Sequence, residues 1–299
     1  MANTIVPAEL LQSSGYNIKL GNTAGDSITT GEYNITVGNN AGTAISTGNR
    51  NVVIGASSGD AITTGAENVS IGTSSLTTNT TGSNNVAIGD QSLSDLTTAD
   101  NNTAVGTDAL TANTTGSGNT AMGHLAMAAN TTGNSNVAVG RYALDANTTA
   151  SENTAVGYYS LSANTTGADN VAVGRGALQA NTTASHNTAV GHDSLIANTV
   201  GAYNTAVGSL SMETNVDGSR NAAFGYGALR TFEPSSASDT YNTAVGFAAL
   251  SATTTGTNNT AVGGNALSAN TTGAGNTAVG KSSMAATTTG ANNSALGKD

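Results

Sequence analysis

The chain contains no cysteine and no tryptophan among its 299 residues, and it has only two prolines. Without cysteine it can form no disulfide, no catalytic thiol and no zinc or iron–sulfur site held by thiolates. Aromatic residues make up 4% of the chain and charged residues 9%. An ordinary globular core built on large side chains is therefore not expected.

Basic residues are also scarce, with 8 Lys and Arg against 18 Asp and Glu, and the net charge is −10. Nucleic-acid binding depends on clustered basic side chains, so no nucleic-acid partner is expected. No apolar run is long enough to span a bilayer, and the first residues lack the basic segment and apolar stretch of a secretory signal. We therefore expect no membrane insertion.

What the chain has in abundance is a short repeat. An Asn recurs at seventeen-residue intervals and is followed four residues later by Gly, as at Asn17 and Gly21. The interval lengthens once, to twenty-one residues, between Asn221 and Asn242. Helical repeats need roughly 33 to 47 residues, whereas one turn of a parallel β-solenoid fits the length found here. The sequence predicts an all-β fold, a parallel β-solenoid of about seventeen coils.

We expect the repeated Asn side chains to form a structural ladder of amides along the solenoid axis, each bonded to the next and to the turn backbone. A ligand-binding role for so many identical residues is the less economical alternative. The ladder residues are Asn17, Asn34, Asn51, Asn68, Asn85, Asn102, Asn119, Asn136, Asn153, Asn170, Asn187, Asn204, Asn221, Asn242, Asn259, Asn276 and Asn293.

Each repeat begins with a pattern that alternates like a short strand, Asn-Thr-Ala-Val-Gly in its commonest form. The first and third residues after the Asn are mostly β-branched or apolar, so we expect them to point into the coil, with Asn and Ala on the opposite face. The Gly marks a corner where φ is positive or where no side chain fits.

A second apolar file begins in the repeat of Asn68, where a Leu or Met lies eight residues after each Asn. The residue before it is always Ala or Ser, which indicates that two backbones approach closely there, within one coil or between chains. The earlier repeats differ, with Ile28, Ile45 and Ile62 in place of this file. We therefore divide the chain into an N-terminal cap or attachment segment (1–16), root coils (17–67) and a main shaft (68–297) with a loop insertion near 230–241.

Chemistry-bearing residues do not cluster. Carboxylates are scattered without an apolar pocket that would separate their pKa values, and His124, His186 and His192 lack neighbours at metal-ligand spacing. We expect no enzyme activity, no catalytic residue, no metal and no cofactor.

The insertion near 230–241 is the one break in the repeat, and loops on a rigid scaffold often contain binding residues. Aromatic residues gather in the sequence around it, and one hypothesis is that they form a contact surface for a sugar or a protein receptor. The alternative is that these rings stack between coils and only stabilise the solenoid. The candidate receptor-contact residues are Tyr203, Tyr226, Phe232, Tyr241 and Phe247.

Asn-Val-Ala-Ile-Gly at 85–89 and Asn-Val-Ala-Val-Gly at 136–140 resemble the head repeats of YadA-type trimeric adhesins, although each repeat here is three residues longer. The fuller pattern at 153–167 is similar to repeats of phage tail-fibre and other virion proteins. The resemblance covers Asn17 to Gly297. It implies a homotrimer of left-handed parallel β-rolls.

The resemblance implies a structural fibre or spike on the surface of a virus particle, with a phage favoured because the secretory signal and membrane barrel of a YadA-type adhesin are not seen. Expected partners are further copies of the chain, other virion proteins at the N-terminal end and a host surface glycan or protein. The alternatives are a purely structural capsid or tail decoration, a bacterial adhesin head and, because paired threonines such as Thr114 and Thr115 recur, an ice-binding solenoid.

Overall fold

The computed structural model describes residues 16–234 and 236–298, and they form a parallel β-solenoid. The N-terminal segment predicted as a cap therefore lies, except for Tyr16, outside the described residues. Backbone contacts divide the chain into two units, Met1–Thr149 and Ala150–Asp299. The described residues include no helix, and accordingly none that could cross a membrane.

The first unit contributes one three-residue strand per coil. These strands are β1 (Ile18–Leu20), β2 (Ile35–Val37), β3 (Val52–Ile54), β4 (Val69–Ile71), β5 (Val86–Ile88), β6 (Thr103–Val105), β7 (Thr120–Met122) and β8 (Val137–Val139). Each strand pairs in parallel with the next, in a register that matches residues seventeen positions apart, such as Ile18 with Ile35.

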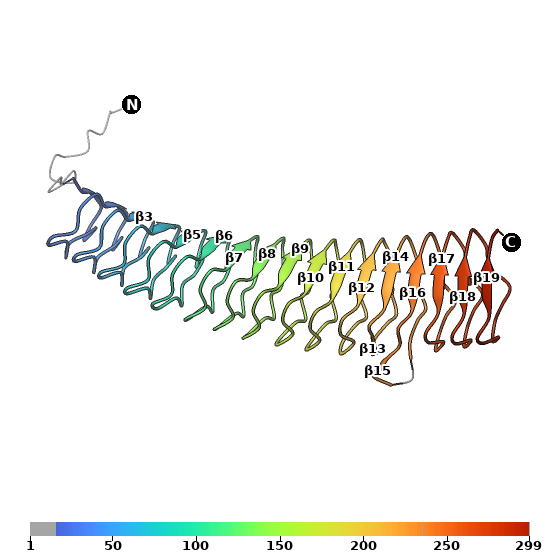
Figure 1. Ribbon diagram of the computed structural model, residues 1–299. Helices are drawn as coiled ribbons and strands as arrows, with labels where there is room; N and C mark the ends of the chain where they lie inside the picture. The colour runs from blue at the N-terminus through green and yellow to red at the C-terminus, as the bar shows by residue number, and fades with distance from the viewer. Residues whose placement is uncertain (1–15, 235, 299) are drawn as a thin grey trace, which may run out of the picture. The chain divides into compact units, whose positions relative to one another are not determined.

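The second unit repeats this arrangement and adds one short strand pair. Its strands are β9 (Thr154–Val156), β10 (Val171–Val173), β11 (Thr188–Val190), β12 (Thr205–Val207), β13 (Gly218–Ser219), β14 (Ala222–Phe224), β15 (Ser238–Asp239), β16 (Thr243–Val245), β17 (Thr260–Val262), β18 (Thr277–Val279) and β19 (Ser294–Leu296). The three-residue strands pair in sequence order, and β13 pairs with β15. Figure 1 shows the strands of each unit side by side on one side of its coils, with β15 on the projecting insertion.

The predicted orientation of the strands is wrong. From β2 to β18 the middle residue of each three-residue strand is buried, as Ala155 and Ala172 are, together with the Asn before the strand. The first and third residues, which we expected inside, lie partly or largely in solvent; Met122 is 44% exposed and Phe224 41%. The sequence correctly predicted which residues share a face of the strand, but the face expected inside the coil is the outer one.

The reason is that the coil is thin behind the strand. The small residue before the Leu file faces the strand across the interior, so that the Oγ of Ser194 donates to the carbonyl of Ala206 at 3.0 Å. Ser58 and Ser70 likewise lie 2.7 Å apart through their hydroxyls. The hydroxyls of Ser70 and Ser75 lie 2.7 Å apart within one coil. The close approach indicated by the Ala and Ser file is therefore inside the solenoid, within a coil and between neighbouring coils.

In the root coils the buried middle residue can be β-branched, as Thr36 and Val53 are, because Gly42 and Gly59 leave space beside them. From β4 onward the middle residue is Ala or Ser, and the β-branched residues lie at the first and third positions.

The Leu and Met file is buried and has a left-handed backbone, with φ of 50 for Leu195 and 51 for Met212. Non-glycine residues adopt this conformation at some cost, which burial of a large side chain offsets here. In the root coils the same position is Gly42 or Gly59, where a left-handed φ is not strained. The Cδ1 atom of Ile45 lies 2.7 Å from where a Cβ of Gly42 would be, so the Ile fills the volume that Leu fills in later coils.

Candidate functional site

The repeated Asn forms a hydrogen-bonded ladder within each unit. The side-chain oxygen of Asn187 accepts from the backbone N–H of Asn204 at 2.9 Å, and its amide donates to the carbonyl of Gly201 at 2.9 Å. The same pair of bonds recurs in the first unit, for example around Asn34. All ladder residues from Asn17 to Asn276 are buried, and only Asn293, in the last coil, is exposed. These bonds use both ends of the amide, so the geometry is that of a structural ladder.

A second amide ladder, which the sequence analysis missed, runs eleven residues after the first. In the second unit the amide of Asn181 donates to the side-chain oxygen of Asn164 at 3.0 Å, and Asn198 and Asn215 continue the series. In the first unit Asn130 donates to Asn113 at 2.9 Å. The recurring Asn-Thr-Thr-Gly pattern was the available signal, since its Asn bonds to the carbonyl of its own Gly or Ala three residues on, as Asn164 does with Gly167.

The first and third strand residues of successive coils form a uniform surface along each unit, here called the outer strand face. It contains Thr, Val, Ile, Leu, Met, Phe, Ala and Ser and no charged residue in any coil. Ile54 and Ile88 are each 36% exposed, and Met122 and Phe224 more so. Large contiguous apolar surfaces are uncommon on soluble monomers, and they usually mark a site of interaction with another molecule.

The candidate receptor-contact residues do not form one patch. Phe232 is fully buried, so its assignment as a contact residue is wrong. Tyr203 and Tyr241 each precede a ladder Asn, whereas Tyr226 and Phe247 each follow a corner Gly, at the other end of the strand. The structure therefore separates the four exposed rings into two pairs.

The two pairs differ in what covers their rings. The ring of Tyr203 is stacked on His186 at 4.9 Å between centroids and carries the guanidinium of Arg220 at 4.8 Å. Arg220 in turn pairs with Asp239 of the insertion at 2.9 Å. Tyr226 and Phe247 stack on each other at 5.5 Å, with an interplanar angle of 11°. The stacking alternative thus describes Tyr203, Tyr226 and Phe247, whereas the hydroxyl of Tyr241 donates to Asp239 at 3.2 Å. The Tyr226 and Phe247 stack leaves the outer face of the Phe247 ring without a partner ring among the described residues.

The insertion is anchored by residues that replace parts of the regular coil. Phe232 occupies the place that Asn215 holds in the second amide ladder of the preceding coil. The N–H of Val216 donates to the Oε2 of Glu233 at 2.6 Å, where the coils before it use a backbone carbonyl. Burial raises the pKa of the Glu233 carboxyl, the hydrogen bond from Val216 opposes this shift and Asp217 adds to it.

Glu233→Gln is expected to gain stability relative to the wild-type protein as pH rises. The pKa of Glu233 is raised in the folded state, so protonation of this carboxyl stabilises the folded protein. This contribution to the free energy of unfolding is complete below the pKa of the unfolded chain, about 4.3, and is lost as pH rises through the pKa of the folded state. The Gln oxygen still accepts from Val216. Thermal midpoints of both proteins between about pH 4 and pH 7 check this. A difference that stays constant across that range would show that Glu233 does not titrate differently on folding.

Several other charged groups are paired on the surface. Arg50 with Glu67 and Arg230 with Glu213 form exposed ion pairs at 3.0 and 2.6 Å, and such pairs add little stability. His192 contacts Arg175 at 2.7 Å. In the part of the chain that the structure describes, no group of three or more His, Asp or Glu is arranged to hold a metal ion.

The threonine pairs are divided by the coil geometry. The hydroxyl of Thr114 donates to the carbonyl of Thr131 at 3.1 Å, and the side chain is half-buried, whereas Thr115 is exposed. The same holds for Thr165 in the second unit. Only one threonine of each pair therefore faces water.

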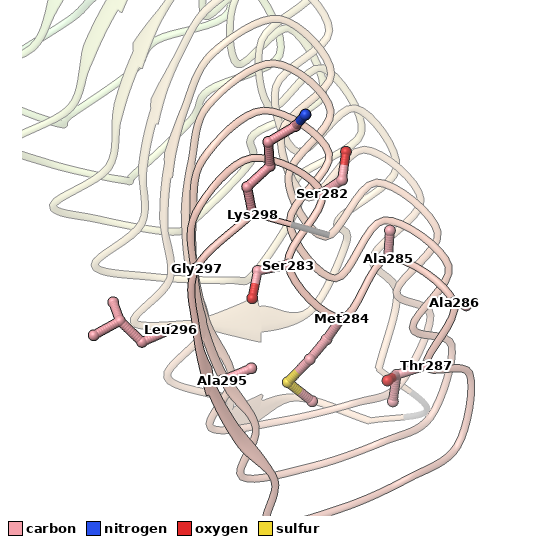
Figure 2. A pocket seen from close by; sticks show the side chains of 10 residues that line it. All are labelled: Ser282, Ser283, Met284, Ala285, Ala286, Thr287, Ala295, Leu296, Gly297 and Lys298. Atoms are coloured by element: carbon pink, nitrogen blue, oxygen red, sulfur yellow. The ribbon is translucent and has the colours of Figure 1, made fainter.

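A cavity of about 640 Å³ lies at the end of the last described coil (Figure 2). Met284 and Ala295 line it, and their equivalents one coil earlier, Leu267 and Ala278, are fully buried. In Figure 2 the sulfur of Met284 faces the open space while Leu296 points away from it. The cavity is thus the uncovered interior of a coil, and its lining contains no carboxylate or imidazole.

Comparison with known proteins adds no family to this description, because no family model matches the chain and no curated protein matches it in a sequence search.

Proposed function

We propose that this chain is a structural fibre or spike protein of a virus particle, with a phage favoured, that assembles as a homotrimer and displays a host-contacting surface. The observation that carries the assembly is the outer strand face, which is uncharged in every coil and exposes Ile, Val, Met and Phe side chains. The repeat resemblance to phage tail-fibre proteins and YadA-type heads supports the virion role.

The occupant of the outer strand face is a second copy of the chain. Its apolar side chains repeat at the spacing of parallel strands, about 4.8 Å, through many successive coils. Only a partner with the same axial spacing can meet every coil equivalently, and a copy of this chain has that spacing. Closed cyclic symmetry covers the outer strand face of every copy. The resemblance to YadA-type heads supports three copies.

Placing Lys on the outer strand face is expected to dissociate the oligomer while the coil persists. The double variant Val173→Lys, Val190→Lys puts two charges per copy into an apolar interface, where an unpaired charge is strongly unfavourable. The matched control is Thr183→Lys, at an exposed position away from the strand. Light scattering should give a trimer mass for the wild type and the control and a smaller mass for the double variant, with circular dichroism unchanged.

A second variant keeps the test decisive if the double variant aggregates. Since the chain has no cysteine, Val190→Cys introduces a single thiol on the outer strand face. Mild oxidation should convert two chains of each trimer into a covalent dimer, whereas Thr183→Cys should not cross-link. A monomeric wild-type protein without cross-linking would overturn the assembly.

A competition assay with purified protein distinguishes host contact from a purely structural role. Purified trimer should reduce adsorption of the particle to its host, while a decoration or shaft protein should leave adsorption unchanged. A bacterial adhesin head would instead be found on cells rather than on particles.

Ice binding is a second candidate because the outer strand face presents Thr and Val alternately in many coils, as at Thr188 and Val190. This array differs from the threonine pairs considered from the sequence, of which only one member is exposed. A monomer with thermal hysteresis would favour ice as the occupant of the outer strand face, and a trimer without it favours the fibre.

A further inference from the structure

An aromatic file in the second unit is interrupted by a gap one coil high. The residue after the corner Gly is Tyr226 in one coil and Phe247 in the next, and their rings stack at 5.5 Å. The following coils place Gly264 and Lys281 at the same position. Phe247 is 59% exposed and Tyr226 48%. One face of the Phe247 ring is therefore covered by Tyr226, and on the other side the file has no side chain.

The position of Gly264 has room for a ring. A Cβ placed on it meets only the carbonyl oxygen of Phe247, at 4.0 Å, and its φ lies outside the left-handed range. Adjacent coils are about 4.8 Å apart, so a ring at this level continues the stack at a spacing that aromatic pairs favour, about 4.5–7 Å. This gap above Phe247, with Gly264 as its back wall, is here called the notch.

Polar residues stand beside the notch and one coil beyond it: Asn265 follows Gly264, and Lys281 and Ser282 take the equivalent places in the next coil. The side-chain amide of Asn265 and the hydroxyl of Ser282 make no hydrogen bond to any described residue, and Lys281 forms no ion pair with the part of the chain that the structure describes. The backbone at Asn265 and Ser282 is held in the coil ladder, since their N–H groups donate to Phe247 and Gly264. An exposed aromatic ring, two neutral polar side chains and one cation are therefore available within one coil of the notch.

We propose that the notch binds a carboxylated pyranose unit of an acidic glycan. The C–H face of the sugar ring stacks on Phe247, the carboxylate pairs with Lys281, and hydroxyl groups bond to Asn265 and Ser282. A purely aromatic ligand would leave these polar groups unused. A nucleic acid would need several neighbouring cations, whereas this protein is acidic overall. The inference deepens the proposed host contact and rests on it for the source of the glycan.

Titration calorimetry of the full chain with a galacturonate tetrasaccharide tests the proposal, with galactotetraose as the uncharged probe. Phe247→Ala should weaken binding about ten-fold through loss of the stacked ring. Lys281→Gln should reduce the preference for the charged probe over the uncharged one. Gly264→Tyr should fill the notch with its own ring and abolish binding, and the open space there predicts that this variant folds.

The matched control is Ser209→Tyr, which adds a ring in the same file on the far side of Tyr226 and leaves the notch open. It should bind like the wild type. Failure of the wild-type protein to bind the tetrasaccharide would overturn the proposal, as would equal binding by Gly264→Tyr or binding of a single-stranded oligonucleotide in its place. Light scattering of the same samples reports the oligomer independently, so a missing glycan site and a missing trimer are distinguishable.

Discussion

Gly191→Ala is expected to lower the free energy of unfolding by at least about 3 kcal/mol. Gly191 follows β11 with φ of +138, a conformation that L-residues rarely adopt. A Cβ at this position would lie 2.6 Å from both the carbonyl carbon and the oxygen of Gly208 in the next coil. Those are backbone atoms, so relief requires the two coils to move apart. That movement strains the strand pairing between β11 and β12 on which stacking depends.

Thermal and denaturant unfolding followed by circular dichroism measure this effect. The matched control is Gly264→Ala, one residue after the corner Gly263, where the added methyl group meets no close atom and φ is not left-handed. It should be neutral or stabilising by up to about 1 kcal/mol, because Ala restricts the unfolded chain more than Gly does. Similar losses in both variants would mean that glycine content, and not the corner contact, governs stability.

The fold was predictable from the sequence because one spacing fixes it. A repeat of seventeen residues is too short for a pair of helices and matches one turn of a parallel β-solenoid. The strands accordingly pair residues seventeen positions apart. The positions of corners followed from Gly191 and its equivalents for the same reason. Local pattern and global fold agree here, which is typical of a repeat protein whose coils contact only their neighbours.

The direction of the strand side chains was not predictable from alternation alone. Alternation states which residues share a face, but the depth of the coil decides which face is inside. That depth depends on a contact between residues twelve positions apart, Ser194 and Ala206, which no local pattern encodes. The Ala and Ser file was a partial signal, because from Asn68 onward a small residue in this file stands together with Ala or Ser in the middle of the strand and Leu or Met in the next file.

The aromatic residues show a second limit. Tyr226 and Phe247 were correctly aligned by the repeat, but the lengthened interval hid that Phe232 occupies a ladder position rather than the loop surface. The notch exists because Gly264 has no side chain. The residues that could contact a ligand there, Phe247 and Lys281, lie one coil away on either side. Such a feature becomes visible only when the coils are aligned in register.

Asn187→Ala is expected to destabilise the second unit by about 2–6 kcal/mol. The substitution leaves the buried N–H of Asn204 without its acceptor and the carbonyl of Gly201 without its donor. Each unsatisfied buried group costs about 1–3 kcal/mol, and neighbouring coils are too closely stacked to admit water without separating. Unfolding in urea measures the loss, and the exposed control Thr183→Ala should change stability by no more than about 0.5 kcal/mol.

Asn187→Asp separates the two hydrogen bonds of the ladder. The carboxylate still accepts from Asn204, but its second oxygen faces the carbonyl of Gly201 and cannot donate unless it is protonated. Burial and this repulsion raise the pKa of the introduced carboxyl, so the variant should be closest to wild type below about pH 4 and should lose stability as pH rises through the folded value. A deficit independent of pH would show that the donor half of the ladder contributes nothing, and the stack would then depend on the N–H to side-chain bonds alone.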